Sequence, residues 1–177
     1  MKVTVREWTI TDAEDLAAAL NNEKIHANLR DGLPLPYTKA DAEYYINSML
    51  GADKNSVFAF AVEVGGKAVG SVGVFRQSNI HYRTAELGYY LAEEYWGKGI
   101  MTQAVKAVCK FVFDNSDILR IYAEPFATNH ASCRVLAKAG FSFEGVLVSN
   151  AYKNGKVLDM KLYALVREDE CAEDDGE

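Results

Sequence analysis

Two glycines separated by one residue could do chemistry through the backbone. Gly97 and Gly99 lie in the stretch YWGKGIMT, directly before a segment whose apolar residues recur at helical spacing. The first N–H groups of a helix lack intrahelical partners and carry partial positive charge, so they attract anions, and glycine lets a phosphate approach closely. A sharp turn or a packing requirement would also explain glycine. The pair alone therefore leaves a turn, a packing requirement and an anion site open.

The familiar nucleotide-binding motifs do not fit this stretch. A Walker loop needs Ser or Thr after its lysine, whereas Gly99 follows Lys98. The six-residue dinucleotide motif needs glycine where this chain has Thr102. A nucleotide-binding protein is thus a weak alternative.

Four polar residues could take part in proton transfer or ligand binding. Asn129 and Ser132 begin an expected helix, where asparagine is an ordinary N-cap and serine an ordinary first-turn residue. Glu86 lies on an expected strand and Glu124 near the end of another, and each could be a general base or form an ion pair at a strand edge. We interpret the remaining candidates as surface or loop histidines (His26, His81, His130) and inert thiols (Cys109, Cys133, Cys171).

The periodicity of the chain predicts a mixed α+β order of about seven strands and four helices. Gly65-Gly66 and Asn154-Gly155 are typical of two-residue hairpin turns. Thr11 and Glu14 suggest a capping box for the first helix, and Thr38 caps the second. The expected strands span 3–8, 57–64, 67–75, 84–91, 120–125, 141–148 and 157–166, and the expected helices 11–21, 39–50, 99–114 and 129–139.

Composition favours one globular domain. The 177 residues are 49% hydrophobic, but no run approaches the ~18 apolar residues that span a bilayer, and the amino terminus resembles no signal peptide. We therefore expect a cytoplasmic protein. The net charge of −6 comes from residues 168–177, which hold seven of the 25 acidic residues, so we expect a domain over 1–167 and a disordered acidic tail. No basic block suggests nucleic acid, and no cysteine or histidine spacing suggests a metal.

Two motifs together resemble a known family. The run AELGYYLAEEYWGKGIMTQAV, followed about thirty residues later by NHASCRVLAKAGFSFEG, resembles the acetyl-coenzyme A core of the GNAT superfamily of N-acetyltransferases. The pattern is most similar to the RimJ/RimL branch, whose characterised members acetylate amino termini of ribosomal proteins. The LPLPYT segment near the amino terminus is also similar to that branch.

The resemblance implies a GNAT-type fold, in which a mixed, mostly antiparallel sheet is splayed around the acyl-CoA site. It implies that pantetheine pairs with the backbone of Leu91. It further implies that Asn129 contacts pantetheine and that Ser132, beside the thioester sulfur, is the general acid; similar sequences often carry a glutamate at Glu86, the expected base. The pyrophosphate would bind backbone N–H groups of the turn and helix start, namely Gly97, Lys98, Gly99, Ile100, Met101 and Thr102.

Two positions depart from the family pattern. The superfamily often begins the phosphate loop with Gln or Arg where this chain has Glu94, which weakens any binding role for that side chain. Ribosomal-protein acetylating members use a glutamate on the strand after the second motif, where the best match here is Ala151. The second departure argues against a ribosomal-protein acceptor.

The expected function is therefore direct transfer of acetyl from acetyl-CoA to a primary amine. At pH 7 an α-amine with pKa near ~7.8 is about a tenth neutral, whereas a lysine amine near ~10.4 is neutral about four times in ten thousand. An α-amine of a protein N-terminus or small molecule is thus the favoured acceptor. A domain that binds acyl-CoA without turnover is the alternative, and a homodimer is compatible with the resemblance.

Overall fold

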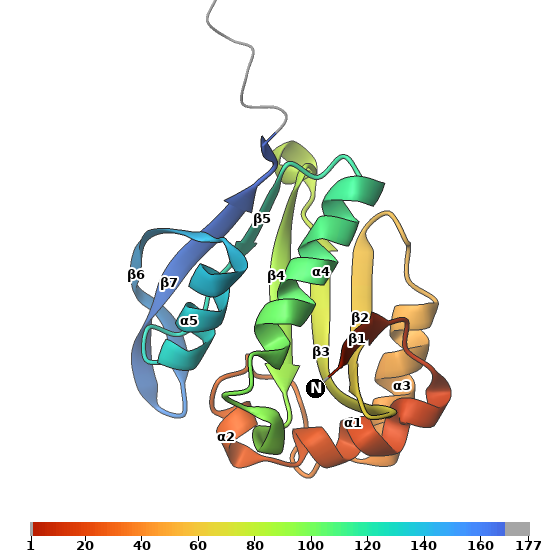
Figure 1. Cartoon of the computed structure of the whole chain (residues 1–177). Helices are drawn as coiled ribbons and strands as arrows, with labels where there is room; N and C mark the ends of the chain where they lie inside the picture. The colour runs from red at the N-terminus through yellow and green to blue at the C-terminus, as the bar shows by residue number, and fades with distance from the viewer. Residues whose placement is uncertain (1, 169–177) are drawn as a thin grey trace, which may run out of the picture.

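One seven-stranded sheet forms the centre of the protein (Figure 1). The computed structural model describes residues 2–168. The strand order is β1-β2-β3-β4-β5-β7-β6, and every neighbouring pair is antiparallel except β4–β5, which is parallel. The strands are β1 (Val3–Arg6), β2 (Val57–Val64), β3 (Lys67–Arg76), β4 (Thr84–Leu91), β5 (Arg120–Ala123), β6 (Ser142–Lys153) and β7 (Lys156–Val166). The predicted mixed, mostly antiparallel sheet is confirmed.

Helices cover both faces of this sheet. The helices α4 (Ile100–Asn115) and α5 (His130–Ala139) share one buried apolar cluster with the sheet. The helices α1 (Ala13–Leu20) and α3 (Lys39–Leu50) enclose a second cluster against the opposite face. The one-turn helix α2 (Glu23–His26), which the sequence did not predict, follows α1. Within residues 2–168, no helix has the length and apolar character needed to cross a membrane.

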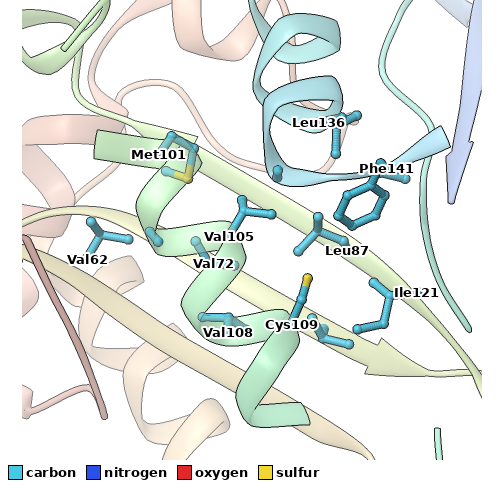
Figure 2. Packing of buried hydrophobic residues seen from close by; sticks show 14 of the residues in the cluster. Val62, Val72, Leu87, Met101, Val105, Val108, Cys109, Ile121, Leu136 and Phe141 are labelled. Carbon is cyan, nitrogen blue, oxygen red and sulfur yellow. The ribbon is translucent and has the colours of Figure 1, made fainter. Parts of the chain in front are cut away.

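The position of α4 follows from its apolar spacing. Met101, Val105 and Val108 repeat every three or four residues, so they form one stripe along the helix. Figure 2 shows this stripe lying over Val72 of β3 and Leu87 of β4. Burying the stripe fixes the start of α4, and hence the glycine turn, at the end of β4.

The first strand and helix, β1 and α1, are shorter than the predicted 3–8 and 11–21, and the capping box also differs from the prediction. The capping box is formed by Thr9 and Asp12, not by Thr11 and Glu14. Asp12 accepts hydrogen bonds from the Thr9 N–H (2.9 Å) and also from both terminal nitrogens of Arg6 on β1 (2.7 and 2.8 Å). This capping box begins the 3₁₀ turn Ile10–Asp12, which directly precedes α1, and Arg6 holds Asp12 in place.

Both predicted hairpins are confirmed. Gly65 and Gly66 join β2 to β3, and Asn154 and Gly155 join β6 to β7, all four with positive φ. Thr38 also caps α3 as predicted, accepting from the Asp41 N–H at 3.2 Å. Of the expected acidic tail, only Glu168 belongs to the described residues. The rest of the tail, with Cys171, lies outside them.

The strands β4 and β5 separate along their length. They pair only through Thr84↔Arg120, Ala85↔Ile121 and Glu86↔Tyr122, although β4 continues for five more residues. On its other side β5 stays paired with β7 through Ala123, and beyond it the Lys161 N–H donates to the Pro125 carbonyl at 2.9 Å. The sheet therefore opens between β4 and β5, toward the turn that contains Gly97 and Gly99.

Candidate active site

The second half of β4 offers backbone groups to the opening between β4 and β5. The Ala92 N–H donates to the Val69 carbonyl (2.8 Å), and Gly70 lies opposite Leu91 in the antiparallel ladder. Leu91 is therefore in a pair whose own N–H and C=O point away from β3. The same holds for Tyr89, two residues earlier. The Leu91 carbonyl already accepts a hydrogen bond from Trp96 Nε1 at 2.7 Å. One lone pair of this carbonyl and the Leu91 N–H can still bond to a ligand.

The glycine turn has the geometry of an anion site. Gly97 and Gly99 have φ values of 74° and 72°, and a Cβ at either position would meet nothing within 4 Å. The first helical N–H that bonds back is that of Gln103, to the Gly99 carbonyl at 3.2 Å. The N–H groups of Ile100 to Thr102 are therefore left without intrahelical acceptors. An oxyanion could approach this backbone without meeting a side chain.

The side chains of the turn point elsewhere. Ile100 and Met101 are 1% and 5% exposed, because both pack into the core below α4. Lys98 Nζ donates to the Glu94 carbonyl (2.7 Å) and lies 5.4 Å from the centre of the Tyr95 ring. Any phosphate bound here would therefore be held mainly by main-chain groups.

Asn129 and Ser132 lie at the start of α5. Asn129 is the N-cap, and its Oδ1 accepts from the Ser132 N–H at 3.1 Å. Asn129 therefore has the N-cap role that the sequence allowed. Its side-chain NH₂ group takes no part in this cap. The Ser132 hydroxyl is half-buried and reaches toward β4.

Tyr89 is a residue of the site that the sequence did not indicate. Its side chain extends from β4 to α5, where the hydroxyl lies 2.6 Å from Ser132 Oγ and donates to the Ser132 carbonyl at 3.2 Å. Burial raises the pKa of the Tyr89 phenol above its usual range, and the hydrogen bond to Ser132 partly offsets this. The alternation of β4 could have placed Tyr89 on this face, but not opposite Ser132.

Glu86 and Glu124 come together around one arginine. Arg30, in the loop between α2 and α3, binds both carboxylate oxygens of Glu86 and lies 3.8 Å from a Glu124 oxygen. Burial and the negative charge of Glu86 raise the pKa of Glu124, and Arg30 partly offsets this. Arg30 is 65% exposed, so its ion pair with Glu86 can open at a cost of only ~1 kcal/mol.

The hydroxyl pair and the carboxylate pair lie on opposite faces of the sheet. Side chains alternate along a strand, so Tyr89 faces α5 together with Leu87, whereas Glu86 faces the α1 and α3 side together with Tyr90. The strands β4 and β5 diverge directly after Glu86. A molecule in the opening could therefore be reached from both faces.

A cavity of about 310 Å³ adjoins Glu124 and Arg30. Lys153, at the end of β6, closes one side of it: its Nζ donates to the Leu29 carbonyl (2.6 Å) and to Asp31 (2.9 Å). The loop that carries Arg30 is thereby attached to the β6–β7 hairpin. The lining residues are Arg30, Asp31, Glu124, Phe126, Asn150, Ala151, Tyr152, Lys153 and Met160. Ala151, where the resemblance led us to look for a glutamate, lies in the cavity wall. The carboxylate of Glu124 lines the same cavity.

These features fit acetyl-coenzyme A. The turn offers free N–H groups to a pyrophosphate, and the unpaired half of β4 offers N–H and C=O groups to the pantetheine amides. Of the predicted binding residues, Leu91 ends β4, Gly97 to Thr102 form the turn and the start of α4, and Asn129 and Ser132 lie at the start of α5, where Ser132 contacts Tyr89 of β4. Glu86 lies on the other face. Among residues 2–168, no three His, Cys, Asp or Glu side chains are grouped to hold a metal ion.

Sequence comparison identifies relatives over most of the chain. The family model for the acetyltransferase (GNAT) domain matches residues 2–142. The probable N-acetyltransferase YjcK of Bacillus subtilis is 30% identical over 95% of this chain and 96% of its own length. The uncharacterized N-acetyltransferase YoaA of the same organism is 35% identical over 56% of this chain and only 55% of that protein.

Structural comparison agrees with the family match. The ribosomal-protein-S5-alanine acetyltransferase from Vibrio fischeri superposes with a TM-score of 0.84 at 26% identity, covering 96% of this chain and 95% of that one. The family model, the relatives and the fold thus agree with the geometry of the turn and the opening. The chain belongs to the GNAT acetyltransferase family and is an N-acetyltransferase that uses acetyl-CoA.

Proposed function

We propose that the protein transfers acetyl from acetyl-CoA directly to an α-amine, of a protein N-terminus or of a small molecule. The observation that carries this proposal is the arrangement of Ser132 and Glu86 on opposite faces of the opening between β4 and β5. The acceptor would enter from the carboxylate face, and the thioester would lie toward Ser132. The cytoplasmic location, the homodimer and the acidic tail stay predictions.

The reaction needs a base and an acid from the chain. The amine nitrogen attacks the thioester carbonyl carbon, the C–S bond breaks, and the sulfur receives the electron pair. Glu86 would remove the ammonium proton, after its ion pair with Arg30 opens, and release it to solvent. As the amide forms, the attacking nitrogen would lose a second proton to Glu86. Ser132 would donate its hydroxyl proton to the leaving sulfur and be reprotonated from solvent. No covalent intermediate on the enzyme is required.

The α-amine is favoured by energetics and by one of the solved structures. Deprotonating a lysine-like amine instead of an α-amine costs an additional ~3.5 kcal/mol at neutral pH, because the pKa values differ by about 2.6. A carboxylate therefore suits the α-amine better as an acceptor of the proton, because the α-ammonium group is the stronger acid of the two. The Vibrio fischeri neighbour is described as acting on an alanine of ribosomal protein S5. Ala151 is the observation against a ribosomal acceptor.

An amine panel tests the proposal. Isothermal titration would first establish acetyl-CoA binding, and thiol release would then be followed with N-terminal peptides, free amino acids, lysine and polyamines. We expect turnover to be highest with an α-amine. Tight binding without release on any amine would instead support a domain that binds acyl-CoA without turnover.

The assignment of the base can be tested with Glu86→Gln. We expect kcat to fall about 100-fold across the pH range, because a general base typically contributes this much. Glu63→Gln is a control, since Glu63 also binds an arginine, Arg6, but lies on β2, which β3 separates from β4. A pH profile of kcat for the three proteins measures the effect.

The pH profile of Glu86→Gln would also show whether Glu124 is the general base instead. The negative charge of Glu86 raises the pKa of Glu124, so Glu86→Gln lowers it. If Glu124 were the base, the variant would stay active and the acidic limb of its profile would move to lower pH. That result would contradict the assignment of Glu86.

Gly88 leaves space on the proposed acceptor face. It lies between Glu86 and Tyr90 on the same side of β4 and is exposed, and a Cβ at this position would meet no heavy atom within 4 Å. Its φ is not positive, so the backbone does not require glycine. We expect Gly88→Val to reduce kcat/KM for the acceptor about 100-fold, because a reacting atom displaced by ~1 Å costs this much.

The same variant should leave the donor site and the fold intact. Acetyl-CoA affinity should change less than about twofold, and the melting temperature should not fall, because valine favours a strand more than glycine does. Gly145→Val in β6 is the control, since that glycine also has open space and no positive φ. Unchanged acceptor kinetics in Gly88→Val would argue against acceptor entry at this point.

A further inference from the structure

The hydroxyl of Tyr89 is the closest polar neighbour of the serine that the proposed function uses as the acid. The two oxygens lie 2.6 Å apart, although the residues are 43 positions apart in the chain and belong to β4 and α5. This contact crosses the side of the opening that faces α5, beside the unpaired backbone of Leu91. It therefore lies where the thioester would be placed.

The hydrogen of Tyr89 has two acceptors within reach. It can be donated to the Ser132 carbonyl at 3.2 Å or to Ser132 Oγ at 2.6 Å. In the first arrangement the serine hydrogen can point to the tyrosine oxygen and away from the opening. In the second, Tyr89 is the donor, and the serine hydrogen is free to point into the opening. Only the second arrangement presents a proton to a leaving sulfur.

We propose that Tyr89 is a positioning residue, which donates its hydrogen bond to Ser132 Oγ and so directs the serine hydroxyl proton toward the thioester sulfur. As the proton moves from Oγ to sulfur, negative charge develops on Oγ, and a hydrogen bond from Tyr89 stabilises it. Tyr89 keeps its own proton throughout. The inference rests on the proposed role of Ser132.

The environment of Tyr89 fits a permanent donor. The ring is packed against the cluster below α4 and α5, so its orientation is fixed. Burial raises the pKa of the phenol, which opposes loss of its proton at neutral pH. A group that stays protonated can orient and stabilise a neighbouring oxygen without being consumed in the reaction.

A double-mutant cycle tests the inference. Tyr89→Phe retains the ring and removes only the hydroxyl, and we expect it to lower kcat about 10-fold, as the loss of one hydrogen bond to a charged oxygen does. If Tyr89 acts through Ser132, adding Tyr89→Phe to Ser132→Ala should lower kcat by less than about twofold. Thiol release with acetyl-CoA and the best amine of the panel, at high enzyme concentration, measures all four rates.

Two controls separate this role from a structural one. Acetyl-CoA affinity and the melting temperature of Tyr89→Phe should stay close to those of the unmodified protein. Tyr45→Phe, which removes a buried hydroxyl on α3, should leave kcat unchanged. Equal losses from Tyr89→Phe in both backgrounds, or no loss in the first, would overturn the inference while leaving Ser132 as the acid. Full turnover in Ser132→Ala alone would remove the acid assignment and the inference with it, but not amine acetylation.

Discussion

Replacing Gly99 by alanine is expected to raise the dissociation constant of acetyl-CoA about 10- to 100-fold. Gly99 has a φ of 72° and forms the N-cap of α4, directly before the free N–H groups of Ile100 to Thr102. A Cβ at this position would occupy the open space through which a phosphate reaches the backbone. Losing one charge-assisted hydrogen bond, at about 1.5–3 kcal/mol, accounts for the magnitude. Isothermal titration measures it.

Backbone strain must be separated from loss of the ligand contact. Alanine at positive φ costs ~1 kcal/mol in any turn. Gly155→Ala is the matched control, because Gly155 has a φ of 76°, also has open space around its Cβ position, and lies in the β6–β7 hairpin. Both variants should lose similar stability, but only Gly99→Ala should lose affinity. Lys98→Ala should have little effect, since Lys98 is bound to the Glu94 carbonyl. Equal affinities for Gly99→Ala and Gly155→Ala would refute phosphate binding at the turn.

Ser132→Ala should lower kcat about 100-fold and leave acetyl-CoA affinity unchanged. The expected loss lies at the lower end of the range for general acids, because a thiolate is already a tolerable leaving group at neutral pH. Steady-state thiol release and isothermal titration together measure the two quantities. Ser48→Ala is the control, because its hydroxyl bonds only to the Tyr44 carbonyl on the surface of α3. Wild-type turnover in Ser132→Ala would show that the thiolate leaves without this proton.

The elements that support the site could be predicted because their signals are local. Alternation gave β4 within its observed bounds, Thr84–Leu91, and the two glycines marked the turn before α4. Asn154 and Gly155 predicted their hairpin equally well, because a two-residue turn needs positive φ at both positions and few residues other than Asn and Gly adopt it. Asn129 as an N-cap followed from side-chain chemistry alone.

The contacts between distant elements could not be predicted. The pairing of Tyr89 with Ser132 depends on how far β4 and β5 separate, which no local pattern encodes. The helix α2 is a single turn and too short to show periodicity. Thr9 replaced Thr11 as the cap because Asp12 also binds Arg6. The first and third differences involve contacts outside the local pattern, whereas α2 was missed because it is short.

The attachment of Lys153 has a consequence for redesigning the acceptor specificity of this enzyme. Its ammonium group is bound to Leu29 and Asp31, which are more than 120 positions away in the chain, and its side chain is only 8% exposed. A loop transplanted from a relative into residues 27–38 would leave this buried cation without acceptors, unless the new loop restored them. The loop and the tip of the β6–β7 hairpin should therefore be exchanged together, as a single module.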